Sequence, residues 1–122
     1  MMATKNFTLA DFEAAASGEG ITLVDFWASW CGPCRMFGPI FEEASNRHED
    51  VTFAKVDTEA EQELAARAGI QSIPTVMGFR DGVAVFRHSG VIQGAELDSI
   101  IQQIRDLDMD EVRAKIAEQQ ES

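Results

Sequence analysis

The stretch ITLVDFWASWCGPC, residues 21–34, decides the fold, because an apolar and β-branched run leads directly into two cysteines. Residues 21–26 are almost all apolar, a pattern typical of a strand that is buried on both faces. The residues that follow the cysteines predict a helix to about Arg47. The cysteines are therefore expected at a junction between a buried strand and a helix.

The segments on either side of this stretch alternate between helix and strand patterns. Capping boxes begin at Thr8 and Thr58, and each predicts the start of a helix. Gly69 closes the second of these helices, and Asp81-Gly82 is a strong signal for a two-residue hairpin turn. The predicted order is α, β, α, β, α, β, β, α. The first two elements are expected over residues 8–18 and 21–26, and the second helix runs from the cysteine segment to about residue 47. The others are expected over residues 51–56, 58–69, 75–80, 83–88 and 95–107.

Parallel alternation of strands and helices that ends in a hairpin predicts an α/β fold with a central mixed β-sheet flanked by helices on both faces. We expect this domain to span residues 1–107. Residues 108–122 add a short C-terminal helical extension, whose capping motif begins at Asp108. We expect its few apolar side chains to pack on the domain, and docking to a partner is the alternative.

Composition excludes several classes of function. Acidic residues outnumber basic ones by 21 to 10, giving a formal net charge of −11, which argues against nucleic-acid binding because that needs clustered lysines and arginines. No apolar run approaches the roughly 18 residues of a membrane span, and the start of the chain lacks a signal-peptide pattern. We therefore expect a cytoplasmic monomer in a reducing compartment, where structural disulfides are rare.

The two cysteines, Cys31 and Cys34, are three positions apart. Residues at this spacing on a helix lie about 5–6 Å apart, within the roughly 4.4–6.8 Å that a disulfide allows between Cα atoms. The pair can therefore close and reopen without moving the fold. Free N–H groups and the macrodipole at the helix N-terminus favour a thiolate on Cys31, whereas Cys34 is expected to be shielded one turn further in. Cys31 is thus the expected attacking thiol, and Cys34 the resolving one.

Two other uses of a CxxC pair fit this sequence poorly. A zinc finger would need a second histidine about three to five residues after His48, and the other histidine, His88, lies far outside that spacing. Haem attachment would need a histidine directly after Cys34, where the chain has Arg35. We predict no metal site, and we expect both histidines on the surface.

Residues 25–35, DFWASWCGPCR, with Pro39 beyond them, resemble the active-site segment of the thioredoxin family almost residue for residue. Ile73-Pro74-Thr75 resembles the family's cis-proline loop, and Gly90 matches the glycine of a third loop at the same site. The resemblance covers about residues 5–107. It implies the thioredoxin fold, a redox-active Cys31–Cys34 disulfide without a bound cofactor, and disulfide-containing proteins as substrates. It also implies recycling by thioredoxin reductase and NADPH.

Asp25 alternates with Ile21 and Leu23 along the predicted strand, so its carboxyl group should face a packed layer. The resemblance implies a proton acceptor for Cys34, acting through water, and Lys55 matches the family's lysine near that aspartate. The alternatives are an edge-exposed aspartate and a solvated lysine. The residues expected to bind substrate are Trp30, Gly32, Pro33, Ile73, Pro74, Gly90 and Val91. 

Gly78 departs from the family pattern, because it lies in a strand that usually carries large apolar residues. It suggests looser packing or a bulge at that position.

The function expected from these residues is general protein disulfide reduction by a dithiol–disulfide oxidoreductase. An oxidase or isomerase is the alternative within the same chemistry, and Gly-Pro between the cysteines argues against it. A binding module whose redox state gates docking to a partner enzyme is the alternative of a different class.

Overall fold

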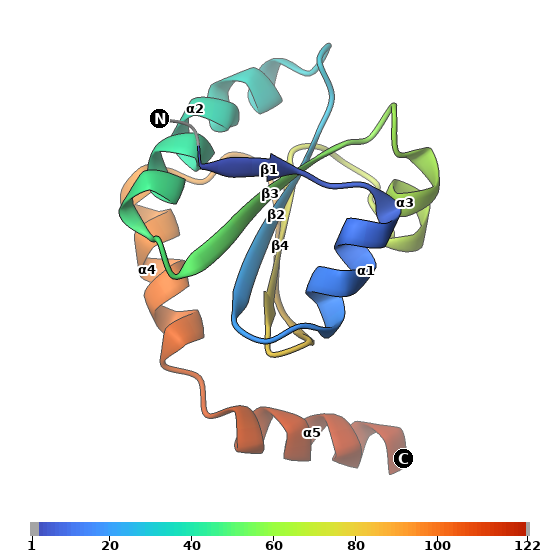
Figure 1. Cartoon of the computed structure of the whole chain (residues 1–122), viewed down its shortest axis with the longest axis vertical. Helices are drawn as coiled ribbons and strands as arrows, with labels where there is room; N and C mark the ends of the chain where they lie inside the picture. The colour runs from blue at the N-terminus through green and yellow to red at the C-terminus, as the bar shows by residue number, and fades with distance from the viewer. Residues whose placement is uncertain (1–2, 122) are drawn as a thin grey trace.

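The computed structural model describes residues 3–121, and a five-stranded sheet with the order β1-β3-β2-β4-β5 runs through its centre (Figure 1). Strands β1, β3 and β2 are parallel, whereas β4 and β5 each run antiparallel to the preceding neighbour in that order. The strands are β1 Thr4–Asn6, β2 Ile21–Trp27, β3 Val51–Asp57, β4 Thr75–Arg80 and β5 Val83–Ser89. The helices are α1 Leu9–Ser17, α2 Gly32–Arg47, α3 Gln62–Arg67, α4 Gly94–Arg105 and α5 Met109–Glu121. The predicted mixed sheet is confirmed.

Helices α2 and α4 cover one face of the sheet, and α1 and α3 cover the other (Figure 1). Because side chains alternate along a strand, successive residues of β2 enter the two opposite cores. Leu23 packs with Phe37 and Phe41 of α2, while Phe26 packs beneath Phe12 of α1. The cysteines therefore follow directly from the carboxyl end of a buried central strand.

Of the two capping boxes expected at helix starts, the structure has the one at Thr8 and lacks the one at Thr58. The capping box at Thr8 is present, with its side chain accepting the backbone N–H of Asp11. The prediction of a capping box at Thr58 is wrong, because the Thr58 hydroxyl donates instead to the carbonyl of Trp27, at 3.0 Å. The carboxylate of Asp57 accepts the N–H of Glu59 and holds a turn there, so α3 begins only at Gln62. Strand β1 was not expected from the sequence.

At Gly78, the expectation of a bulge is confirmed and that of looser packing is wrong. The register of β4 and β5 shifts between Gly78 and Phe79. A Cβ at Gly78 would lie 3.1 Å from Phe86 Cβ, 3.2 Å from Leu23 Cδ2 and 3.3 Å from Ile104 Cδ1. Glycine is therefore needed because its neighbours already fill the space that a side chain would take.

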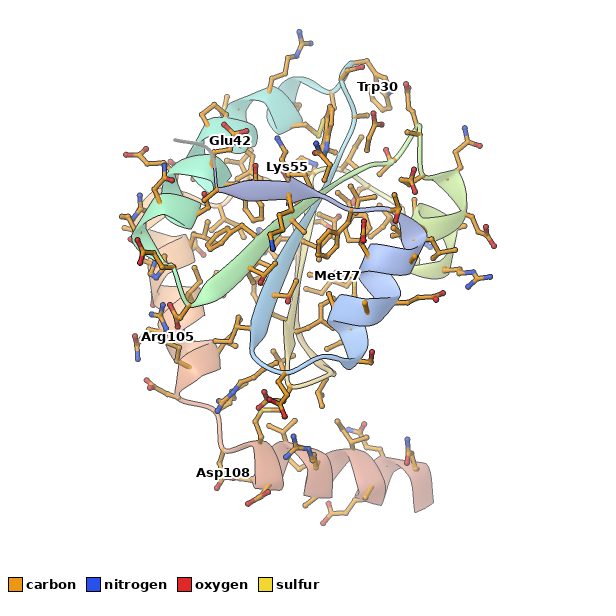
Figure 2. The ribbon with its side chains drawn as sticks, in the orientation of Figure 1. Trp30, Glu42, Lys55, Met77, Arg105 and Asp108 are labelled. Carbon is orange, nitrogen blue, oxygen red and sulfur yellow. A yellow bond between two sulfur atoms is a disulfide. The ribbon has the colours of Figure 1, made fainter. Side chains whose placement is uncertain are left out.

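The C-terminal helix α5 begins where the carboxylate of Asp108 accepts the N–H groups of Asp110 and Glu111. Met109 is buried, which agrees with packing of the extension on the domain. The Arg80 side chain donates to the carbonyls of Ile104 and Arg105 at the end of α4. Figure 2 shows Trp30 and Asp108 at opposite ends of the molecule, so the extension begins far from the cysteines.

Within residues 3–121, none of the helices is both long and apolar enough to cross a membrane.

Candidate active site

The cysteine pair lies where the chain leaves β2 and begins α2. Cys31 is the N-cap of α2, and its Sγ accepts the backbone N–H of Cys34 at 3.2 Å. The two cysteines are joined by a disulfide, with their Cα atoms 5.2 Å apart, as the spacing predicted. In this oxidised state Cys31 is 4% exposed and Cys34 is 5% exposed. The expected difference in shielding is therefore not seen here, and the N-cap hydrogen bond is what distinguishes the two sulfur atoms.

The loop that contains Pro74 reaches the disulfide, and the loop that contains Gly90 is joined to it. The peptide bond between Ile73 and Pro74 is cis, and the carbonyl oxygen of Ile73 lies 3.7 Å from Cys31 Sγ. Gly90, at φ +108°, donates its N–H to the carbonyl of Pro74 at 2.8 Å, a conformation that glycine adopts without steric cost. Ile73 and Val91 are half-buried beside these loops, whereas Pro74 is buried. The structure thus brings Ile73 against Cys31 and Gly90 against Pro74.

The exposed part of this region includes two large apolar side chains. Trp30 is 64% exposed, and its indole N–H donates to the carboxylate of Glu59. Gly32 and Pro33 are also exposed, at the start of α2. Sequence reasoning missed Met36, which is 63% exposed one turn further along the same helix.

Asp25 lies in β2, opposite Lys55 of β3 and Val76 of β4. Its side chain is almost fully buried, and neither carboxylate oxygen has a hydrogen-bond partner among residues 3–121. Burial raises the pKa of Asp25 to about 7; the positive charge of Lys55 opposes this rise, and the negative charge of Glu42 adds to it. The expected packed layer is confirmed, and the edge-exposed alternative is excluded.

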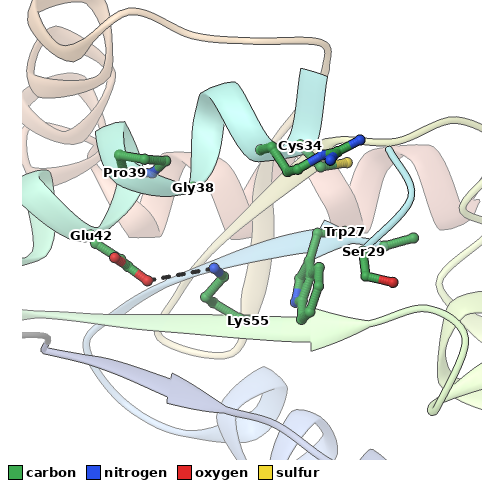
Figure 3. A pocket seen from close by; sticks show the side chains of 9 residues that line it. Trp27, Ser29, Cys34, Gly38, Pro39, Glu42 and Lys55 are labelled. Atoms are coloured by element: carbon green, nitrogen blue, oxygen red, sulfur yellow. Dashed lines mark ion pairs between the residues drawn. The ribbon is translucent and has the colours of Figure 1, made fainter. Parts of the chain in front are cut away.

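Lys55 does not extend into solvent. Its Nζ lies 3.6 Å from Glu42 Oε1 and 5.2 Å from the centre of the Trp27 ring. The solvated-lysine alternative therefore does not describe this residue. Figure 3 shows the Lys55 ammonium facing Glu42 across a cavity that Cys34 also lines, with a volume of about 270 Å³.

Sequence reasoning also missed Glu42. Its signal is its position four residues after Gly38, which is itself four residues after Cys34, so that all three lie on one face of α2. The structure confirms that they line the same cavity.

The expectation that both histidines lie on the surface is wrong for His48. Its Nε2 donates to Asp98 at 2.7 Å, and its Nδ1 accepts from Arg105 at 2.9 Å, so it joins the end of α2 to α4. The side chain of His48 is 12% exposed, whereas His88 is exposed. In residues 3–121, no group of three or more histidine, cysteine or acidic side chains is placed to hold a metal ion.

A cysteine pair at a helix N-terminus, with a proline loop beside it, defines a dithiol–disulfide exchange site. The buried Asp25 lies on β2, the strand that leads to this pair. The family model for thioredoxin matches residues 3–105. The chain belongs to the thioredoxin family and is a thiol–disulfide oxidoreductase with protein-disulfide reductase activity.

Similar proteins come from distant organisms. The chain is 49% identical, over 120 residues, to "Putative thioredoxin 2" of Streptomyces coelicolor, a match that covers 98% of this chain and 90% of that protein. It is 47% identical over 81 residues to the thioredoxin of Alicyclobacillus acidocaldarius, covering 66% of this chain and 77% of that one. The crystal structure of Malassezia sympodialis thioredoxin superposes with a TM-score of 0.76 at 31% identity, covering 84% of this chain and 91% of the other.

Proposed function

We propose that this chain is a general protein disulfide reductase, with Cys31 as the attacking thiol and Cys34 as the resolving thiol. The observation that carries these roles is the hydrogen bond from the Cys34 N–H to Cys31 Sγ at the start of α2. In the reduced protein this donor and the helix dipole would stabilise a thiolate on Cys31. Cys34 lies inside the helix and lines the cavity. We propose that it attacks Cys31 Sγ once the mixed disulfide has formed.

The reaction proceeds by two thiol exchanges. The Cys31 thiolate attacks one sulfur of a substrate disulfide, forming a mixed disulfide and releasing the other sulfur as a thiolate, which takes a proton from water. Cys34 then loses its proton to Asp25, through water, and attacks Cys31 Sγ. The second substrate sulfur leaves as a thiolate, which takes a proton from water, and the chain holds the Cys31–Cys34 disulfide. Two electrons have then passed to the substrate. The positive charge of Lys55 acts on the Asp25 carboxylate, which accepts the proton.

An apolar surface around Cys31 would bind the substrate chain. Trp30 and Ile73 line a groove of about 210 Å³ that continues along Ile70. Backbone groups of the proline loop lie against the disulfide, and such groups suit an extended peptide of any sequence. The residues assigned to substrate binding are Trp30, Gly32, Pro33, Ile73, Pro74, Gly90 and Val91.

We assign the catalytic domain to residues 1–107 and the helical extension to residues 108–122. The net charge of −11 supports a monomer that binds neither nucleic acid nor membranes. A cytoplasmic location fits a dithiol that must stay reduced between turnovers.

Recycling by thioredoxin reductase is expected to support continuous turnover. In a mixture of NADPH, a bacterial thioredoxin reductase and insulin, the wild-type chain should oxidise NADPH until the insulin disulfides are consumed, measured at 340 nm. The variant with both Cys31→Ser and Cys34→Ser should give only the background rate, because no dithiol carries the electrons. If the wild-type chain also gives only background while its chemically reduced form reduces insulin, the assigned recycling partner is wrong.

A further inference from the structure

Asp25 belongs to strand β2. The carboxylate of Glu42 enters the site from helix α2. Figure 3 shows it pointing across the cavity to Lys55, and their charged atoms are 3.6 Å apart. Both side chains are largely buried, with 17% of Lys55 and 25% of Glu42 exposed. An ion pair in such a place is screened less by solvent than one on the surface.

We propose that Glu42 is a positioning residue for thiol exchange, because it draws the Lys55 ammonium toward α2 and so keeps it from neutralising the carboxylate of Asp25. This inference rests on the proposed role of Asp25 as proton acceptor. It assigns to Glu42 the control of when Asp25 is charged.

The position of the Lys55 ammonium supports this role. It is held by the Glu42 carboxylate and by the face of the Trp27 ring. A Cβ added at Gly38 would lie 3.7 Å from Lys55 Nζ, so the ammonium reaches the surface of α2 itself. Although Asp25 and Lys55 are paired in register on neighbouring strands, the carboxylate of Asp25 has no hydrogen-bond partner in the described part of the chain.

The charges around Asp25 come from few elements. Lys55 of β3 is the positive group, and Glu42 of α2 is the negative one. The partner of Asp25 on β4 is the uncharged Val76. On α2, Cys34 is a titratable neighbour of the cavity only when reduced, and Arg35 lines the cavity from an exposed position. Glu42 therefore raises the pKa of Asp25 in two ways. Its own negative charge disfavours the ionised carboxylate, and it holds the positive charge of Lys55 toward α2.

The test is the titration of Asp25 in Glu42→Gln, followed by NMR of the carboxyl carbon in the oxidised full-length chain. The substitution removes a negative charge and frees Lys55 to approach Asp25. Both changes favour the ionised carboxylate, so the midpoint should fall by about one pH unit. The exposed neighbour on the same helix gives the matched control, Glu43→Gln, which should leave the midpoint unchanged. A shift in Glu42→Gln no larger than in Glu43→Gln overturns the proposal.

A second background separates the two ways in which Glu42 acts. In Lys55→Met, where no ammonium can be drawn away, Glu42→Gln should lower the Asp25 midpoint by less than half as much. An equal shift in both backgrounds would mean that Glu42 acts only by direct repulsion, and it would overturn its assignment as the residue that positions Lys55.

The pH profile of mixed-disulfide resolution gives a readout that a purely structural residue would not move. Its acid limb should shift to lower pH in Glu42→Gln by the same amount as the Asp25 midpoint. If instead Asp25→Asn resolves the mixed disulfide as fast as the wild-type chain, the proton-acceptor role fails, while the NMR titration still decides what Glu42 does to Asp25.

Discussion

Asp25→Asn is expected to raise the free energy of unfolding at pH 8 by up to about 4 kcal/mol. The pKa of Asp25 is raised by burial from 3.8 to about 7, and each unit of difference between folded and unfolded states corresponds to about 1.4 kcal/mol. At pH 8 the wild-type carboxylate is charged, and none of the residues that the structure describes gives it a hydrogen bond. That cost is removed when a neutral amide replaces the carboxylate.

The pH dependence follows from the same difference. Between about pH 4 and pH 7 the folded state binds the Asp25 proton more tightly than the unfolded state does, so the stability of the wild-type chain falls as pH rises through this window. The advantage of Asp25→Asn should therefore be about 1–2 kcal/mol at pH 5 and reach its full value above pH 7. Denaturant unfolding at pH 5 and pH 8 measures both.

A fully exposed aspartate provides the control. Asp110→Asn, on α5, should change stability little and by the same amount at both pH values, because its side chain is solvated. An Asp25→Asn variant that is less stable than the wild-type chain at pH 8 would show that Lys55 pairs tightly with the carboxylate in solution. Asp25 would then be an ordinary salt-bridged residue.

Cys34→Ser is expected to stop disulfide reduction after the first exchange. Cys31 can still attack, and without Cys34 the mixed disulfide has no internal route to resolve. A reduced Cys34→Ser chain mixed with a disulfide-containing protein should therefore accumulate an adduct on Cys31, measured by intact mass before and after dithiothreitol. Multiple-turnover reduction by this variant should fall to background.

Cys31→Ser gives the matching variant, because it keeps one cysteine and removes the thiolate at the helix N-terminus. Its adduct on Cys34 should form at least about tenfold more slowly, since Cys34 has no N-cap position to stabilise its thiolate. Equal yields of adduct from the two variants would show that Cys31 is not the preferred attacking thiol and would contradict the assigned roles.

The central features of this molecule were predictable because they depend on local patterns. The apolar run of β2 predicted a strand buried on both faces, and its alternation predicted that Asp25 would face a packed layer. The glycine and aspartate of the hairpin, Asp81 and Gly82, have the positive φ angles of 50° and 81° that such a turn requires.

The features that were missed depend on contacts between distant segments. Strand β1 is only three residues long, too short for a periodic pattern. Thr58 begins a capping-box motif, but its hydroxyl donates instead to a carbonyl at the end of β2. His48 is held by side chains of α4. The role proposed for Glu42 of α2 depends on its ion pair with Lys55 of β3. No pattern within a single segment reports such partners.

The most direct test of thiol exchange by the Cys31–Cys34 dithiol is a single turnover without any recycling system. The reduced chain is mixed with excess insulin, and its mass and disulfides are followed over time. The account predicts that each chain reduces one disulfide, passes through a transient adduct on Cys31, and ends with a Cys31–Cys34 disulfide. A chain that stays reduced in the presence of insulin, or that becomes oxidised without releasing insulin thiols, would contradict it.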